Sequence, residues 1–316
     1  YAGIIMGRNP DVSYGTYRLL SFDELWKKSG FDESEHMFSV RTRSADEEYG
    51  NGVHQWYCGM QDAGGVLQKG PWVGNRFHWY CLFDNEDYRI TKGVKHRFQY
   101  DSQVKNGRGY YYPGTPEYKL MATGKNMDDV KVQEPVAPFN DGLTYTNSIS
   151  SNCLAFTTKY ADVTDPTIGR TDAYWPFLRY ADIVLIYAEA QCELNDGISQ
   201  DAIDALNDIR IRSNAKEASV TGDGAIETKV ELRSVIFEER AKELAYEGDR
   251  RWDLLRWGIY LDVMNSLGGI NEDGTRTPYD EGSINKRREF RHLLYPLPSL
   301  EVSTNMAIDK NNPGWN

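Results

Sequence analysis

The feature that most constrains the fold is an apolar segment in the second half of the chain, at residues 178–194. Its apolar members are Leu178, Tyr180, Ile183, Val184, Leu185, Ile186, Tyr187 and Ala188. They cover almost every side of a helix, and a helix without a polar stripe is normally buried on several sides. The chain has 316 residues, enough to bury such a helix in a substantial core. We therefore predict a helical core built around this segment.

Three further helical segments are predicted after the first one. Gly197 ends the first helix and Ser199 can cap a second, in which Ala202, Ile203, Leu206 and Ile209 follow helical spacing. A third helix is expected over residues 229–246 and, after an interruption at Gly248, a fourth over residues 249–264. Helices joined by short loops tend to lie antiparallel and pack in pairs, so residues 171–316 are predicted to form a helical scaffold.

The first half of the chain has a different pattern. Ser21 and Glu24 form a capping-box pattern and Gly30 closes that short helical piece. From about residue 31 to residue 170, Gly- and Pro-containing pieces separate short apolar runs, which is typical of loops and short strands. Residues 1–170 are therefore expected to form a loop-rich ligand-binding region beside the scaffold, both being parts of one domain.

Charge and composition exclude several classes of protein. The 36 basic and 47 acidic residues give a formal net charge of −11, which disfavours generic binding to nucleic acid or to anionic membrane surfaces. No apolar run approaches the ~20 residues that a membrane-spanning helix needs. The chain starts at Tyr1 without a Met or a leader segment, so we expect a mature or trimmed chain.

Signatures of catalysis and of cofactor binding are missing from the sequence. There is no HExxH or GxSxG motif, and the phosphate-loop-like stretch at residues 65–70 runs into Pro71, which has no N–H to offer a phosphate. The four cysteines contain no CxxC pair. A zinc site from His54, Cys58, His78 and Cys81 is disfavoured against a disulfide or buried thiols, because the two His–Cys spacings differ. No cofactor and no metal are predicted.

Two acids on the first predicted helix leave an alternative open. Asp182 and Glu189 are seven residues apart and share one helix face, so they could act as the paired carboxylates of a glycoside hydrolase. The favoured alternative is that they pair with arginines of the later helices, where Arg240, Arg250, Arg251 and Arg256 cluster. Balanced charges over residues 229–251, with pairs such as Glu238–Lys242, indicate a structural network.

A tryptophan-rich stretch in the irregular half is the remaining candidate site. Flat aromatic faces among polar side chains are suited to sugar rings, because the C–H face of a sugar stacks on the aromatic ring while polar groups take the hydroxyls. The alternative is that these aromatics anchor a loop onto the core. The predicted ligand-binding residues are Asn51, Trp56, Tyr57, Asp62, Trp72 and Arg76.

Four ordered motifs between residues 178 and 315 resemble those of the SusD/RagB family. Residues 178–190 (LRYADIVLIYAEA) resemble its RYAD-x-LL-x-YAEA helix, and residues 207–210 (NDIR) resemble its LN-x-[IV]-R helix. Residues 239–258 (ERAKELAYEGDRRWDLLRWG) are similar to its ER-x-x-ELA[FY]EG…DL-x-RWG signature. The tail, with Tyr295-Pro-Leu-Pro298 and Asn311-Asn-Pro-Gly-Trp315, is similar to its closing pattern. Arg251 and Met306 depart from the family pattern at positions without a clear functional role.

This resemblance implies a fold and a function. The implied fold is mainly α-helical, with tetratricopeptide-like helix pairs beside an irregular ligand-binding part. The implied function is that of a non-enzymatic, lipid-anchored protein on the outer surface of the outer membrane. It would capture glycans and deliver them to a SusC-like TonB-dependent transporter. Family members are usually longer, so the chain resembles the C-terminal part of one. A peptide-binding or scaffolding partner of the same type of transporter is the alternative.

Overall fold

The computed structural model describes two compact units of the chain. It describes residues 1–8, 17–30, 35–45, 48–61, 67–69, 73, 79, 82–84, 86–95, 97–99, 106–109, 144–145, 156–266 and 288–315. The described residues up to Gly248 form the first unit, and those from Asp249 onward form the second. Helices dominate the described residues and the strands are short, which confirms the predicted mainly α-helical fold.

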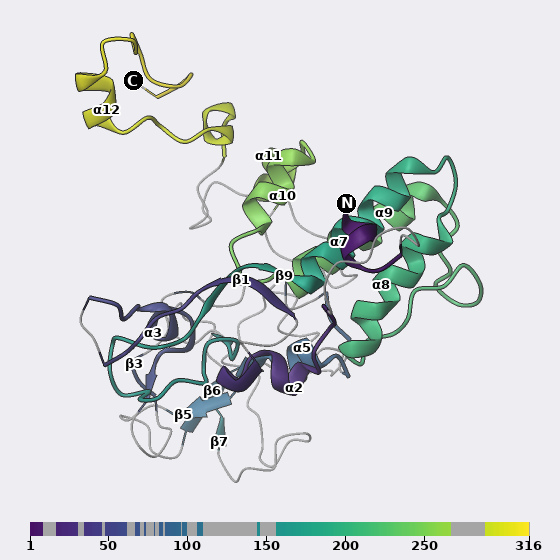
Figure 1. The fold of residues 1–316 in the computed structure, drawn as a ribbon, viewed down its shortest axis with the longest axis horizontal. Helices are drawn as coiled ribbons and strands as arrows, with labels where there is room; N and C mark the ends of the chain where they lie inside the picture. The colour runs from purple at the N-terminus through teal and green to yellow at the C-terminus, as the bar shows by residue number, and fades with distance from the viewer. Residues whose placement is uncertain are drawn as a thin grey trace. The chain divides into compact units, whose positions relative to one another are not determined.

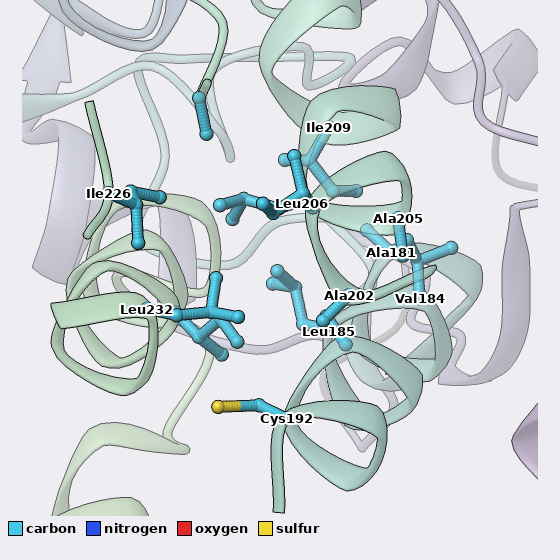
Figure 2. Close-up of a cluster of buried hydrophobic side chains, with 14 of the residues drawn as sticks. Ala181, Val184, Leu185, Cys192, Ala202, Ala205, Leu206, Ile209, Ile226 and Leu232 are labelled. Atoms are coloured by element: carbon cyan, nitrogen blue, oxygen red, sulfur yellow. The ribbon is translucent and has the colours of Figure 1, made fainter. Parts of the chain in front are cut away.

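Three helices form the core of the first unit, and Figure 1 shows them side by side. They are α7 (Tyr180–Leu194), α8 (Gln200–Arg212) and α9 (Lys229–Glu243). Figure 2 shows Leu185 of α7, Leu206 of α8 and Leu232 of α9 directed toward one another, and all three are fully buried. The predicted burial of the apolar segment is therefore confirmed for most of its residues, but Ile186 is 40% exposed.

Local capping determines where two of these helices begin. The Ser199 hydroxyl accepts a hydrogen bond from the Ala202 N–H at 3.3 Å, as predicted for the start of α8. At the start of α9 the Thr228 hydroxyl accepts from the Glu231 N–H, and the Glu231 carboxylate accepts from the Thr228 N–H. The predicted end of α9 at residue 246 is wrong, because Tyr246 has a φ of 67°, in the left-handed region that a helix does not use.

The strands of the first unit are short, and each pairs with its neighbour over only a few residues. β1 (His36–Val40) pairs antiparallel with β9 (Trp175–Arg179), so the helix predicted from residue 178 begins only at Tyr180. The local sequence pattern could not indicate this strand, because its pairing partner lies about 140 residues away in the chain. The remaining strands are β2 (Met60–Gln61), β3 (Leu67–Lys69), β4 (Val94–Lys95), β5 (Arg97–Gln99), β6 (Asn106–Gly109), β7 (Thr144–Tyr145) and β8 (Phe156–Thr157). They form the pairs β2–β3 and β4–β8 and the three-stranded sheet β5–β6–β7.

The described part of the first unit also contains short helices. They are α1 (Ala2–Ile5), α2 (Phe22–Leu25), the 3₁₀ turn η1 (Lys28–Gly30), α3 (Val53–Cys58) and α5 (Tyr88–Thr91). The capping box predicted at Ser21 is confirmed, since its N–H and its hydroxyl both donate to Glu24. Gly30 closes this piece because a Cβ there would lie 2.2 Å from the Glu24 carbonyl oxygen.

A buried network of charges joins α9 to the irregular half of the first unit. Arg179 lies at its centre, 2.8 Å from Glu35, 2.7 Å from Glu243 and 2.5 Å from Glu247. Its further members are Asp87, Arg89, Lys159, Arg210, Arg212 and Glu239. The side chains of Arg179 and its three acids are 3% exposed or less. Buried charges persist only when they are paired in this way, so a structural role for these charges is confirmed. The prediction that they neutralise one another within residues 229–251 is wrong, because Glu243 and Glu247 pair with Arg179, which lies outside that segment.

The arginines hold the acids of this network in the charged state. Burial raises the pKa of the Glu243 carboxyl, but Arg212, Arg179 and Arg89 together lower it well below its ordinary value. The same balance lowers the pKa of Glu247, where Arg179 and Lys159 outweigh burial. These carboxylates are therefore occupied by internal partners and are not poised to donate protons.

The described residues of the second unit contain four short elements, α10 (Arg250–Arg256), α11 (Tyr260–Asn265), η4 (Phe290–Leu293) and α12 (Ser299–Thr304). The single helix predicted over residues 249–264 is wrong because Gly258 breaks it with a φ of 73°. The Gly258 N–H donates to Leu255 and the Ile259 N–H donates to Leu254, which is the Schellman pattern of a helix end. In the tail, the indole N–H of Trp315 donates to the Arg291 carbonyl at 2.9 Å.

Among the described residues, no helix combines the length and the hydropathy required to cross a membrane.

Candidate ligand-binding site

The predicted ligand-binding residues divide into two groups. Asn51, Trp56 and Tyr57 lie in or just before α3, in the first unit. Figure 1 shows α3 and α8 toward opposite ends of this unit. Asp62, Trp72 and Arg76 lie outside the described residues.

Helix α3 is held in place by its inner face. Val53, His54 and Cys58 are buried there. The imidazole Nδ1 of His54 lies 2.8 Å from the Tyr160 carbonyl oxygen, and the Cys58 thiol donates to the Thr157 carbonyl at 3.1 Å. Both contacts tie α3 to the chain around β8, so the helix is a fixed support for its outer residues.

The interior of α3 is chemically inert. Burial raises the pKa of the Cys58 thiol to about 12, so the free thiol stays neutral and is a poor nucleophile and metal ligand. Within the described residues, no group of three His, Cys, Asp or Glu side chains could hold a metal ion. His78 and Cys81, the other two members of the disfavoured zinc alternative, lie outside the described residues.

Trp56 lies on the outer face of α3. Its side chain is 49% exposed, so much of one indole surface is open to a ligand. The ring lies against the backbone of Gly52, where an added Cβ would be only 3.0 Å from Trp56 Cε2. The Val73 N–H donates to the Trp56 carbonyl at 2.9 Å. The indole is thus both presented to solvent and fixed in direction, the combination that a stacking platform requires.

Tyr57, the next residue, points into an aromatic cluster. Its ring centroid lies 5.5 Å from that of Tyr160, 5.9 Å from that of Trp175 and 5.5 Å from that of Tyr246. Burial raises the pKa of the Tyr57 hydroxyl. The side chain is only half-buried, so it supports the site from below and leaves part of its surface accessible. Its cluster partners are distant in the sequence, and no local pattern indicates them.

The Asn51 side chain is engaged within the protein. Its amide NH₂ donates to the Thr42 hydroxyl at 2.8 Å and to the Ala173 carbonyl at 2.9 Å. Its amide oxygen accepts from the Val53 N–H at 2.8 Å and from the Thr171 hydroxyl at 3.3 Å. Both amide protons and both acceptor sites are used. The geometry indicates that Asn51 positions the first turn of α3, a role that residue type alone does not reveal.

Trp79 shows the anchoring alternative for an aromatic of the same region. Its indole N–H donates to the Ala241 carbonyl on α9 at 2.7 Å, and its ring packs edge-on against Phe83 at 4.7 Å. Trp79 therefore fastens the irregular part to the helical core, whereas Trp56 remains exposed.

The two acids of the hydrolase alternative lie on α7. Arg240 holds Asp182 at 2.7 Å, which confirms the predicted ion pair for this residue. Glu189 lies seven residues further along the same helix and is half-buried. The predicted Glu238–Lys242 pair is also present, at 2.7 Å.

Comparison with known proteins identifies the relatives of this chain. The model of the SusD family matches residues 61–315. SusD-like protein P2 of Formosa agariphila is 33% identical over 142 residues, which cover 44% of this chain and 25% of that protein. SusD-like protein P38 of the same organism is 36% identical over 142 residues, covering 43% and 25%.

Solved structures have the same fold. A SusD homolog from Bacteroides thetaiotaomicron superposes with a TM-score of 0.64 at 20% identity, over 99% of this chain and 58% of that one. The surface glycan-binding protein A from Bacteroides thetaiotaomicron, in complex with laminarihexaose, gives a TM-score of 0.56 at 19% identity, over 95% and 56%. A laminarin-binding SusD-like protein gives 0.59 at 19% identity, over 99% and 57%.

The matched segments therefore cover about a quarter of the length of each curated relative. The superposed regions cover just over half of the length of each of these solved structures. The family model, in contrast, extends over most of this chain, and the four motifs noted in the sequence fall inside its range. The chain belongs to the SusD family.

Proposed function

We propose that this protein is a non-catalytic glycan-binding protein whose contact with the sugar is the exposed face of Trp56. The observation that carries the proposal is the contrast within α3: an inner face fixed by buried contacts and an outer indole that is half exposed. A sugar ring can stack its C–H face on such an exposed indole.

Two further considerations support a glycan as the ligand. The chain belongs to the SusD family, and two of its structural neighbours are described as binding a glucan, laminarihexaose in one and laminarin in the other. The buried charges around Arg179 are paired with one another, so ligand contacts are expected in the irregular half. Asp62, Trp72 and Arg76 are proposed to complete the site.

The finer proposal concerns place and partner. By analogy with its family, the protein would act on the cell surface, lipid-anchored in the outer membrane, and would hand the glycan to a SusC-like TonB-dependent transporter. In that role it needs affinity without chemistry, in keeping with an ion-paired Asp182 and a neutral Cys58.

Calorimetric titration tests the proposal. The protein is first screened on a glycan and peptide array that includes laminarihexaose, and the best oligosaccharide is titrated into the wild type and into Trp56→Ala and Trp72→Ala. Loss of one stacking ring should weaken binding at least about fivefold, the equivalent of about 1 kcal/mol.

Trp252→Ala is the matched control, since Trp252 is 58% exposed, belongs to the second unit and is not one of the proposed contacts. It should leave the affinity unchanged. Unchanged binding in both Trp56→Ala and Trp72→Ala would eliminate this site, and an array that responds only to peptides would replace the glycan by a peptide.

A further inference from the structure

A concave site lies in the first unit, beside α2. It has a volume of about 290 Å³, just below the range of about 300–1,000 Å³ that is usual for small-molecule pockets. Its walls come from three segments that are far apart in the sequence: the region of α2, the residue after α5, and the residues after β8. The size suits one sugar ring and excludes a long chain.

The pocket combines an aromatic wall with polar groups. Phe22 and Trp26 supply the rings, and Lys27, Lys92, Thr158 and Asp162 supply ammonium, hydroxyl and carboxylate groups. This is the residue mixture that recognises a hydroxylated ring, whose C–H faces are apolar and whose edges both donate and accept hydrogen bonds.

Several of these polar groups keep hydrogen-bonding capacity. In the described part of the chain, the ammonium of Lys27 has no partner, and Asp162 uses only Oδ2, which accepts from the Lys28 N–H at 2.7 Å. The Thr158 hydroxyl donates to the Lys92 carbonyl at 2.9 Å and can still accept. A ligand hydroxyl could therefore both donate and accept here.

The Trp26 side chain forms a largely buried part of the pocket wall. The residue is 7% exposed, and among the described residues its indole N–H has no hydrogen-bond partner. A buried indole N–H normally has one. The ring itself is fixed, because Lys159 lies 4.7 Å and Arg179 5.6 Å from its centroid. This wall is rigid before any ligand arrives.

The charges on the pocket determine the class of ligand. Two cations, Lys27 and Lys92, face two anions, Asp23 and Asp162, and Lys92 pairs with Asp23 at 2.6 Å. An anionic ligand would meet the carboxylates and a cationic one would meet the ammonium groups. Each charged ligand would thus be repelled by the groups of its own sign, whereas a neutral polyol is repelled by neither.

We propose that this pocket is a second carbohydrate subsite that holds a single neutral sugar residue, separate from the Trp56 platform. The proposal rests on the glycan-binding function proposed above and deepens it: one chain would contact its glycan at two positions. Trp26 forms part of the wall of this subsite.

The indole resonances of ¹⁵N-labelled protein provide the test. The Trp26 signal is assigned by its loss in Trp26→Phe, and the protein is titrated with glucose, galactose, mannose and xylose to concentrations on the order of 10 mM or above, where weak single-ring binding is measurable. We expect a saturable shift of the Trp26 signal with at least one of these neutral sugars. Glucuronate and glucosamine are the charged comparisons, and a response to either of them without a response to a neutral sugar would overturn the proposal.

Matched variants locate the response. Ala161 is exposed and lines the pocket, so Ala161→Trp should fill it and abolish the shift. Ala190→Trp, at an exposed position of α7, should leave the shift intact. If Ala161→Trp fails to fold, Lys27→Ala serves instead and should weaken the apparent affinity severalfold. A shift that survives these pocket variants, or no shift with any neutral sugar, contradicts the subsite.

Trp56→Ala separates the two proposals. It should retain the Trp26 response while losing oligosaccharide affinity. If the Trp26 signal does not shift with any sugar while Trp56→Ala weakens oligosaccharide binding, only the proposal of the pocket subsite is wrong. If the Trp26 signal shifts and Trp56→Ala leaves the oligosaccharide affinity unaltered, only the proposal of the Trp56 platform is wrong. If Trp56→Ala abolishes the shift of the Trp26 signal, the subsite is not separate from the Trp56 platform.

Discussion

At the scale of single residues, the candidate site depends on side chains that a ligand does not touch. Asn51 uses its whole amide to hold Thr42, Val53, Thr171 and Ala173. Asn51→Ala leaves several of these groups without partners and should lower the free energy of unfolding by about 1–3 kcal/mol. Urea denaturation measures this loss.

The control for this prediction is Asn195→Ala, which removes one exposed hydrogen bond to the Gln191 carbonyl and should change stability by less than about 0.5 kcal/mol. If Asn51→Ala kept full stability while losing glycan affinity, Asn51 would be a ligand contact and its positioning role would be wrong.

His54 makes the packing of α3 against the rest of the first unit sensitive to acid. Burial lowers the pKa of this imidazole below its ordinary value of 6.5. The unfolded chain therefore binds a proton at a higher pH than the folded one, so this contribution to stability is full above 6.5 and is lost as the pH falls through the folded-state pKa. His36 is shifted in the same direction by the same cause.

Unfolding free energies measured between about pH 7 and pH 5 should decrease with acidity, and His54→Asn should reduce that slope. Asparagine keeps a donor near the position of Nδ1 but does not titrate. A slope that is equal in the two proteins would show that His54 carries no proton linkage.

At the scale of elements, the buried charge network should contribute more to the free energy of unfolding than the ion pairs on the surface. Arg179→Met leaves Glu35, Glu243 and Glu247 short of a partner in a buried setting and should cost about 3–5 kcal/mol. Arg233→Met removes a pair with Glu193 at an exposed position and should cost about 1 kcal/mol or less. Chemical denaturation of both variants distinguishes them, and equal losses would refute a structural role for the network.

Two glycines test how the helices end. Gly258 has a positive φ, so Gly258→Ala should destabilise the second unit by about 1 kcal/mol. Gly197 has open space around it and lacks a positive φ, so Gly197→Ala should be neutral or slightly stabilising. Thermal unfolding that showed the same change in both variants would contradict this assignment.

The elements also show what a sequence can and cannot predict. The start of α8 was predictable because Ser199 lies beside the N–H groups that it caps, and the burial of α7 followed from its composition. β9 was not predictable, because its partner β1 is distant in the chain. The division of the fourth helix depended on the φ of Gly258, which a glycine allows but does not require.

At the scale of the whole molecule, the family motifs lie largely in the helical frame, whereas the proposed ligand contacts lie outside them. Motifs such as those at residues 178–190 and 239–258 include Arg179, Glu243 and Glu247, which hold one another in the interior. This is why the sequence predicted the fold in detail and the site only as a set of candidates. The exposure of Trp56 and the engagement of Asn51 both depend on contacts between distant segments.

The most direct measurement is the structure of the protein with the oligosaccharide that the array selects. We expect a sugar ring stacked on the outer face of the Trp56 indole, with α7, α8 and α9 unchanged and their ion pairs intact. An oligosaccharide bound among these three helices, with the Trp56 ring uncovered, would contradict it.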